Sequence, residues 1–168
     1  MSDLSGLNAQ MAFFNEESET TADFRENLEL MAVDMGNFYF GIELECVKEL
    51  IRDPNITHVP CLPSYYEGVC NWKGNIIPVV SMRAAGGISQ KEPSQKLVLI
   101  VKSGSLECGI LIGAEPRILG IAPERELTGE LPEAVGSMLV VKQAFEGEDK
   151  VISVIDVEKS LKKMVVFG

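Results

Sequence analysis

Hydrophobic and polar positions alternate with a period of two over short segments along much of the chain. Leu28 and Leu30 alternate with Glu29 in residues 28–34, and a second such segment, 38–43, follows the turn at Gly36-Asn37. A period of two is typical of β-strands, so these two segments are expected to form a hairpin. Further segments rich in β-branched residues are expected to be strands: 47–51, 76–80, 97–101, 106–112, 118–121, 138–141 and 151–155.

Two segments have features typical of a helix. A short helical turn is expected at 81–85, where Gly86-Gly87 would end it. The second is 157–164, which follows Asp156, a residue able to cap a helix, and carries lysines suited to the C-terminal end of the helix dipole. Many short strands with Gly or Pro between them indicate small barrels or a sandwich, so an all-β fold with a short C-terminal helix is predicted.

An internal repeat suggests that the strands form two similar groups. A shift of 68 positions places Gly41 on Gly109 and Leu50 on Ile118, and residues 79–82 correspond to 154–157 after a further seven positions. Because the order of features is preserved, we expect two similar five-stranded barrels packed together. The lobes are expected at roughly 24–85 and 95–156, and an exchange of elements between them is left open.

The chain of 168 residues is long enough for one ordinary domain or two small lobes. Residues 1–23 are polar and acidic, which predicts a disordered arm in front of a domain at 24–168. No apolar segment reaches the roughly 18–20 residues needed to cross a bilayer, and the N-terminus lacks the features of a signal peptide. A cytoplasmic protein without direct membrane insertion is therefore expected.

The charge balance excludes nucleic acid as an expected partner. Acidic residues outnumber basic ones 25 to 15, which gives a net charge of −10, whereas binding to a phosphate backbone needs clustered Lys and Arg. Such a charge suits a protein that meets basic or mixed protein surfaces.

The cysteines do not predict a disulfide or zinc framework. Cys46, Cys61, Cys70 and Cys108 have spacings that match neither, and Cys46 and Cys108 lie in apolar strand-like segments. In the cytoplasm reduced thiols are expected. A metal site built on His58, Cys61 and Cys70 would lack a fourth ligand at close spacing, so no metal or other cofactor is expected.

Two functions other than protein binding can be framed from single residues. Glu43 and Glu45 are expected to alternate onto one face of a strand, where a carboxylate pair could perform acid–base chemistry or simply face solvent at a strand edge. Trp72 and Tyr65 could instead line the pocket of a small-ligand-binding β-barrel. No glycine-lysine phosphate loop or nucleophile elbow accompanies them.

The densest group of residues with special backbone geometry lies between Gly68 and Pro78. Gly68 and Gly74 can adopt positive φ angles, Asn71 can bond to turn backbone, and Pro78 indicates an edge strand or a bulge. Lys73, a long cation between the two glycines, is well placed to reach a carboxylate within the chain or on a partner.

This segment resembles the CheW family, the adaptors that couple chemoreceptors to the histidine kinase CheA. The residues that match the family's motifs are Val47, Glu49, Pro60, Pro63, Gly68, Val69, Asn71, Lys73, Gly74, Pro78, Val79, Met82 and Arg83. Three positions depart from the family pattern: Lys73 replaces an Arg, and Ser81 and Gly113 replace Asp residues. The chain is therefore identified as a divergent member.

The resemblance implies two SH3-like barrels and a non-enzymatic adaptor recruited to membrane-associated receptor arrays. Its partners would be the cytoplasmic tip of a chemoreceptor and the regulatory domain of CheA; an adaptor of a non-flagellar, pilus-type pathway is the closest alternative. The receptor would enter a groove between the barrels, at the matching positions Val47, Glu49, Gly68, Asn71 and Lys73. The kinase would bind the first barrel near Asp53, Asn55, Ile56 and His58.

Overall fold

The computed structural model describes residues 27–88, 95–131 and 137–165, so the acidic arm predicted at 1–23 lies outside the described residues. The strands are β1 (Leu28–Asp34), β2 (Tyr39–Glu43), β3 (Val47–Arg52), β4 (Tyr66–Trp72), β5 (Asn75–Ser81), β6 (Leu97–Ser103), β7 (Leu106–Ile112), β8 (Arg117–Ile121), β9 (Val141–Glu146) and β10 (Val151–Ile155). The α-helices are α1 (Met82–Ala85) and α2 (Val157–Val165), and 3₁₀ turns lie at Leu44–Cys46 and Pro123–Arg125.

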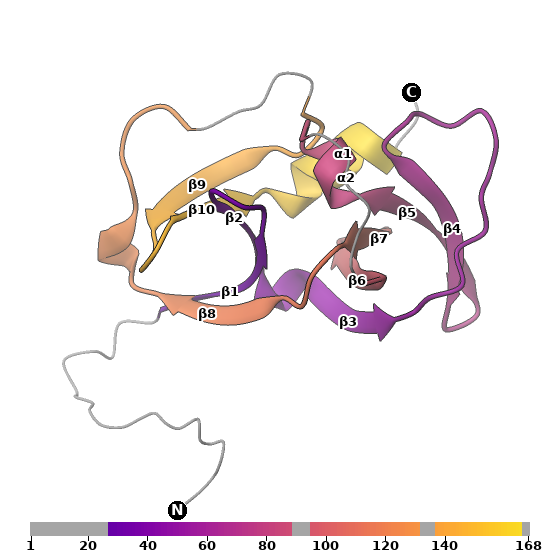
Figure 1. Cartoon of the computed structure of the whole chain (residues 1–168), viewed down its shortest axis with the longest axis horizontal. Coiled ribbons are helices and arrows are strands. Elements are labelled where there is room, and N and C mark those ends of the chain that lie inside the picture. Colours follow the sequence, from indigo (N-terminus) through magenta and orange to yellow (C-terminus); the bar gives the residue numbers. More distant parts are fainter. Residues whose placement is uncertain (1–26, 89–94, 132–136, 166–168) are drawn as a thin grey trace, which may run out of the picture.

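The strands form two five-stranded sheets. Figure 1 shows the two groups of strands side by side. One sheet has the order β8-β1-β2-β10-β9 and is called the β1 barrel here; the other has the order β3-β6-β7-β5-β4 and is called the β3 barrel. In each sheet the two end strands approach one another through an isolated bridge, Glu126 with Phe145 in the β1 barrel and Thr57 with Val69 in the β3 barrel. These bridges curl the sheets into barrels, which confirms the predicted fold class.

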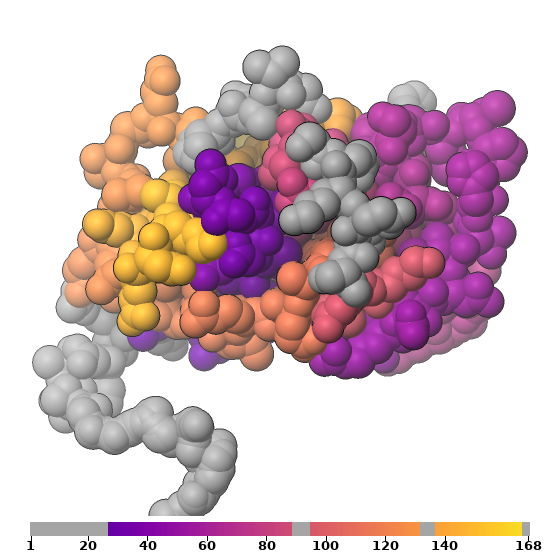
Figure 2. Space-filling model, viewed as in Figure 1, coloured from indigo at the N-terminus to yellow at the C-terminus, as the bar shows by residue number. Residues whose placement is uncertain are grey.

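The two sheets do not divide the chain at the expected lobe boundary. The β1–β2 hairpin of the first half pairs with β8 and β10 of the second half, and the β6–β7 hairpin of the second half pairs with β3 and β5 of the first. In Figure 2 the indigo surface of the N-terminal strands accordingly lies beside the yellow surface near the C-terminus. The two halves have exchanged their hairpins.

The strand register confirms the internal repeat. Gly41 of β2 lies opposite Val154 of β10 in a parallel pair, and Gly109 of β7 lies opposite Val79 of β5 in another. The antiparallel pairs agree: Leu50 lies opposite Leu99, and the corresponding pair in the other barrel is Ile118 with Met31. Each barrel therefore has the same strand order, with β3, β4 and β5 equivalent to β8, β9 and β10.

The hydrophobic core is shared between the barrels. Smaller clusters lie within each barrel, around Ile152 in the β1 barrel and Ile100 in the β3 barrel. The largest cluster of described residues draws on both sheets and on α2, including Ile42, Ile110 and Leu161. Because each half contributes strands to both barrels, neither half can bury its apolar residues alone.

The C-terminal helix forms where it was predicted. Its N-terminus is capped as expected, because Oδ1 of Asp156 accepts a hydrogen bond from the backbone N–H of Lys159 at 3.0 Å. The hydroxyl of Tyr66, at the start of β4, donates to the carbonyl of Met164 at 2.6 Å. Burial raises the pKa of Tyr66 to about 12. The helix thus joins the second half of the chain to the β3 barrel.

Two local predictions were wrong. The strand expected at 138–141 lies instead at Val141–Glu146. Leu139 is apolar because it is buried in the shared core. The N–H of Val140 donates to the Ser160 hydroxyl, and its carbonyl accepts from the N–H of Asp156. Cys46 lies in a 3₁₀ turn rather than a strand and is only half-buried. Short apolar segments cannot by themselves be assigned to strands.

Candidate protein-docking surfaces

A tight turn joins β4 to β5 and holds Lys73 in a rare conformation. Lys73 and Gly74 both have positive φ angles, 53° and 84°, between the paired residues Trp72 and Asn75. Two successive positive φ angles define the type I′ turn, which favours Asn-Gly or Gly-Gly. Oδ1 of Asn71 supports the turn by accepting from the N–H of Gly74 at 3.2 Å. A lysine here costs about 1–2 kcal/mol in backbone strain, yet its side chain is exposed to solvent.

Trp72 brings Lys73 and Glu49 together, although 24 positions of sequence separate these two charges. Nζ of Lys73 lies 5.1 Å from the centroid of the indole ring. On the other side, Nε1 of Trp72 donates to Oε1 of Glu49 at 2.7 Å. Glu49 lies on β3 and Trp72 on β4, the two ends of the strand order, so this contact crosses the seam where the β3 barrel closes. Glu49, Trp72 and Lys73 are called the Trp72 cluster below.

Val47 and Gly68, the other residues assigned to the receptor groove, have different surroundings. Val47 begins β3 and packs, half-buried, against the shared core. Gly68 is buried with φ of +144°, and any Cβ there would overlap the carbonyl group of Thr57. Gly68 therefore offers no side chain to a partner, and its physical role is to let β4 approach the Thr57 backbone.

The segment assigned to kinase binding runs along β4. The N–H of Asp53 donates to the carbonyl of Lys96 at 2.9 Å, and Thr57 exchanges two backbone hydrogen bonds with Val69. Asp53, Asn55 and His58 are exposed, whereas Ile56 is half-buried against the core of the β3 barrel. The segment is thus fixed by backbone contacts and presents polar side chains outward.

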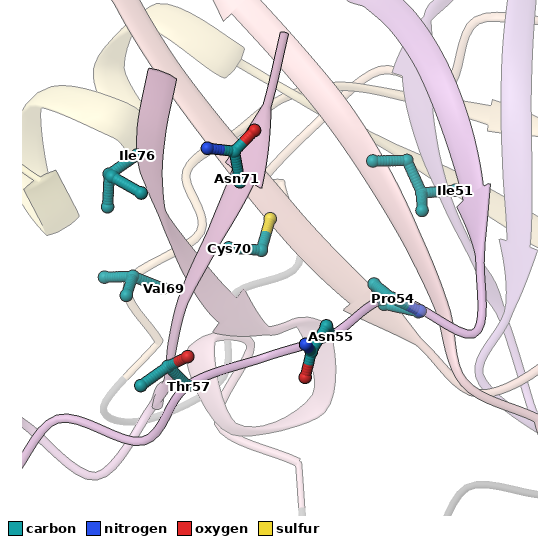
Figure 3. A pocket seen from close by; sticks show the side chains of 8 residues that line it. All are labelled: Ile51, Pro54, Asn55, Thr57, Val69, Cys70, Asn71 and Ile76. Atoms are coloured by element: carbon teal, nitrogen blue, oxygen red, sulfur yellow. The ribbon is translucent and has the colours of Figure 1, made fainter. Parts of the chain in front are cut away.

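A pocket of about 230 Å³ opens between this segment and β4 (Figure 3). Its lining is mainly apolar and consists of Ile51, Pro54, Asn55, Thr57, Val69, Cys70, Asn71 and Ile76. Ile76, whose exposed fraction is 65%, makes this side of the barrel apolar. Sequence analysis missed Ile76, although its alternation with the buried Ile77 and Val79 shows that it faces outward. Asn71 belongs both to this pocket and to the turn at Lys73, so the two surfaces are adjacent.

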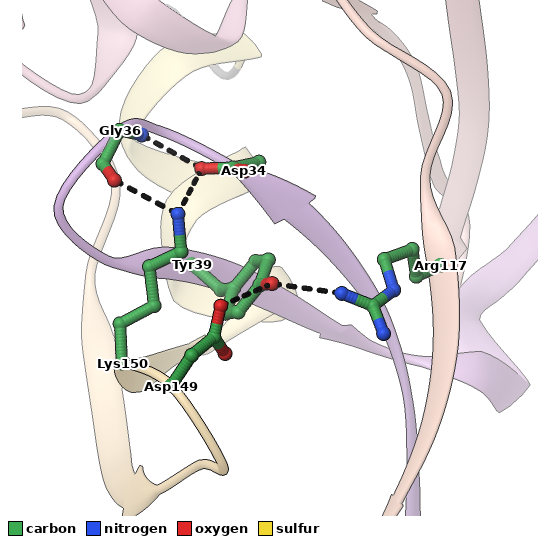
Figure 4. Close-up of polar contacts among 6 residues, drawn as sticks. All are labelled: Asp34, Gly36, Tyr39, Arg117, Asp149 and Lys150. Carbon is green, nitrogen blue, oxygen red and sulfur yellow. Dashed lines mark hydrogen bonds and ion pairs between the residues drawn. The ribbon is translucent and has the colours of Figure 1, made fainter.

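At the equivalent hairpin of the β1 barrel, β9–β10, Asp149 and Lys150 contact other residues of the same barrel (Figure 4). Nζ of Lys150 contacts Oδ1 of Asp34 at 2.7 Å and lies 4.9 Å from the centroid of the Tyr39 ring. The Tyr39 hydroxyl accepts from Arg117 at 3.0 Å and donates to Asp149 at 3.3 Å. Hydrogen bonding to Lys150 lowers the pKa of Asp34 below its ordinary value. In the Trp72 cluster, in contrast, Lys73 pairs with no carboxylate of the described residues.

The structure corrects the carboxylate pair considered for an enzyme. β2 ends at Glu43, and Glu45 lies in the following 3₁₀ turn, so the two side chains do not alternate along one strand. Glu43 is paired with Lys142 at 2.7 Å.

The aromatic pair considered for a ligand pocket is also separated. Tyr65 immediately precedes β4 and packs on the shared core, whereas Trp72 ends the strand and packs on the core of the β3 barrel. Seven residues of extended chain span roughly 20 Å, too far for one small pocket.

The cysteines are free thiols in the structure. Cys70 and Cys108 are buried, Cys61 is exposed, and burial raises the pKa of Cys108 to about 12. Within residues 27–88, 95–131 and 137–165, no three His, Cys, Asp or Glu side chains gather where they could hold a metal ion. In the same ranges no helix has the length and hydropathy that a membrane span needs.

Comparison with known proteins decides the family. The family model described as the CheW-like domain matches residues 29–164, most of the chain. The chain belongs to the CheW-like domain family. The match includes both barrels and α2, and therefore also both candidate surfaces. This CheW-like domain is a divergent member, as its departures at Lys73, Ser81 and Gly113 predict.

Its similarity to individual proteins is low in identity and high in coverage. It is 24% identical to the chemotaxis protein CheW of Thermotoga maritima over 148 residues, which cover 88% of this chain and 97% of that protein. It is 24% identical to the chemotaxis protein CheW of Helicobacter pylori, over 89% of this chain and 94% of that one. The crystal structure of the scaffolding protein TtCheW from Thermoanaerobacter tengcongensis aligns with a TM-score of 0.68 at 22% identity, covering 77% of this chain and 89% of that chain. The shared fold is a pair of SH3-like barrels.

Proposed function

We propose that this CheW-like protein is a non-enzymatic adaptor that couples the cytoplasmic tip of a chemoreceptor to the regulatory domain of CheA. One observation carries the proposal beyond family membership: Lys73 is exposed on a turn whose geometry disfavours lysine. Residues held in strained conformations concentrate at functional sites. A positive charge kept there at a cost in stability suggests that a binding partner requires it.

The receptor would dock on the Trp72 cluster and its surroundings, including Val47, Gly68 and Asn71. Lys73 would meet a carboxylate of the partner, and Glu49 a hydrogen-bond donor or cation. Val47 would contribute apolar area where it emerges from the shared core. Gly68 would act indirectly, by keeping β4 close to the Thr57 backbone.

The kinase would dock on the apolar pocket and on the segment that walls it, which includes Asp53, Asn55, Ile56 and His58. Exposed apolar area of this kind is typical of a protein interface when polar residues border it. Ile76 supplies the apolar centre, and the exposed polar groups of Asp53, Asn55 and His58 supply the rim. These polar groups would favour one orientation of the partner.

Both surfaces lie on the β3 barrel, and Asn71 takes part in each. A receptor and a kinase could therefore contact the adaptor side by side. A signal would pass only if the adaptor binds one state of the kinase more tightly than another, because a ligand shifts an equilibrium by its differential affinity for the two states. The adaptor itself needs no catalytic group for this role.

Co-sedimentation with receptor signalling-domain fragments and CheA of the same organism tests the proposal. The native chain is expected to enter a ternary complex, and Lys73→Glu is expected to weaken receptor binding by roughly 1–3 kcal/mol because it reverses an interface charge. Lys159→Glu makes the same charge change on the exposed side of α2 and should bind normally. If the native chain binds neither partner, singly or together, the adaptor proposal fails.

The same assay separates flagellar from pilus-type pathways. Receptor fragments from each kind of array would be tested against the same adaptor, and preferential binding would identify the pathway. Recruitment to membrane-associated arrays would be checked by imaging a fluorescent fusion of the full chain, with Lys73→Glu expected to disperse the signal.

A further inference from the structure

Trp72 is the one tryptophan of the chain, and its indole contacts both charged residues of the proposed receptor surface. Nε1 donates to Glu49 at 2.7 Å, and Nζ of Lys73 lies 5.1 Å from the ring centroid. The ring therefore restrains one charge through a hydrogen bond and the other through its π face.

The indole is itself well held. Trp72 is half-buried and packs against the core of the β3 barrel with Cys70 and Ile77. It ends β4 and pairs with Asn75 across the type I′ turn. A side chain packed on a core and tied to a strand has few alternative rotamers, so its two charged neighbours are held in a limited set of orientations.

Both charges keep binding capacity for a partner. Among the described residues, no group donates to Oε2 of Glu49, and no carboxylate pairs with Lys73. In the corresponding β9–β10 hairpin of the other barrel, the lysine present, Lys150, pairs with Asp34. The Trp72 cluster thus presents a carboxylate oxygen and an ammonium group that are restrained but unpaired.

We propose that Trp72 is a positioning residue for receptor docking: it pre-orients Glu49 and Lys73 for a partner segment that offers a hydrogen-bond donor to one and a carboxylate to the other. The inference rests on the proposed adaptor function and adds the residue that organises its receptor surface. Ordering long charged side chains at an interface lowers affinity, and a surface ordered before binding avoids that loss.

The competing explanation is that Trp72 touches the receptor directly, as tryptophans at interface hot spots do. The two explanations differ in what happens when Glu49 is already absent. A positioning residue acts through Glu49, so its hydrogen bond has no further effect on binding once Glu49 is removed. A direct contact would still contribute.

The first experiment examines the free protein by NMR. A chain with one tryptophan gives one indole N–H signal, which reports the hydrogen bond from Trp72 to Glu49. Glu49→Ala is expected to speed exchange of this proton with solvent roughly tenfold, since a charge-assisted bond is lost. Glu45→Ala removes a nearby exposed carboxylate without this contact and serves as the control. An unchanged exchange rate in Glu49→Ala would overturn the proposal.

The second experiment is a double-mutant cycle read by the dissociation constant for a receptor fragment. Trp72→Phe keeps an aromatic ring beside Lys73 and removes the Nε1 donor, and it is expected to weaken binding roughly fivefold. In the Glu49→Ala background the same substitution should have no further effect. Thermal unfolding of each variant would confirm that the fold is retained.

Each result has a distinct meaning. If Trp72→Phe binds the receptor fragment as tightly as the native chain does, while the separate variant Lys73→Glu loses binding, the positioning role is overturned. The adaptor function then still stands. Additive losses in the cycle would identify Trp72 as a direct contact and also overturn it. Absence of receptor binding by the native chain overturns the adaptor function together with this inference.

Discussion

At the residue scale, the turn between β4 and β5 carries a lysine where the backbone favours glycine or asparagine. Lys73 has φ of 53°, and it stands where the family pattern has an arginine. An ammonium group reaches a carboxylate less directionally than a guanidinium does. Nζ of Lys73 lies 5.1 Å from the centroid of the Trp72 ring, a contact that restrains the ammonium group.

Replacing Lys73 by asparagine should separate stability from function. Lys73→Asn suits a type I′ turn and should raise the free energy of unfolding by about 0.5–1 kcal/mol, after the lost contact with the indole is counted. Receptor binding should weaken, while Lys73→Arg should retain it. Denaturant unfolding and a binding titration measure the two effects. A fall in stability for Lys73→Asn would show that the lysine supports the hairpin instead.

The ion pair between Asp34 and Lys150 should make the free energy of unfolding depend on pH in the acidic range. Because hydrogen bonding to Lys150 lowers the pKa of Asp34 in the folded state, its contribution is present at neutral pH and is lost as pH falls through that lowered pKa. Asp34→Asn should therefore lower Tm at pH 7, and its difference from the native chain should shrink below pH 3.8, the ordinary pKa of the group. Melting curves across pH test this, and a constant difference would argue against the ion pair.

At the element scale, the β4–β5 hairpin forms the centre of both candidate surfaces. Its strands carry Gly68, Asn71 and Ile76, and its turn carries Lys73. The spacing of these residues along the chain could be read from the sequence. Which of them contact one another depends on how closely β4 approaches the end of β3, and local periodicity carries no information on that approach.

Substituting Gly68 should act through the fold. In Gly68→Ala a Cβ would overlap the Thr57 carbonyl group at a φ that disfavours side chains, so stability should fall by about 2 kcal/mol or more. Gly36→Ala is a matched control, because Gly36 also has a positive φ but open space around it. Thermal unfolding compares the two variants. Equal losses would show that backbone strain alone, without the overlap, accounts for the effect.

At the scale of the whole molecule, the exchanged hairpins join two similar barrels through one core. The repeat gives each barrel the same strand order, yet the equivalent hairpins present different chemistry. Apolar pockets lie on both barrels, about 230 Å³ beside β4 and about 610 Å³ beside β9 and β10. The charges differ: among the described residues Lys73 has no carboxylate partner, whereas Lys150 pairs with Asp34. This difference in charge pairing supports our proposal that the receptor docks on the β3 barrel.

The two proposed surfaces should be separable by mutation. Ile76→Asp places a charge at the apolar pocket and should weaken CheA binding roughly tenfold or more, while receptor binding stays near the native value. Ile118→Asp is the control, because Ile118 is 63% exposed on β8 of the other barrel and Ile76 is 65% exposed. Titration with each partner separately measures both affinities. Loss of receptor binding alone in Ile76→Asp would mean that the two surfaces are assigned the wrong way round.

The sequence by itself determined most strands, the first hairpin, the cap at Asp156, the internal repeat and the family, because periodicity, turn residues and motif spacing are local properties of the chain. It placed Glu49, Lys73 and the Asp53–His58 segment in candidate surfaces through the resemblance. Only the tertiary structure decided the hairpin exchange, the contact of Trp72 with Glu49 across the barrel seam, and the pocket beside Ile76. A period of two tells which face of a strand is buried, but the partner of a strand is chosen by long-range packing.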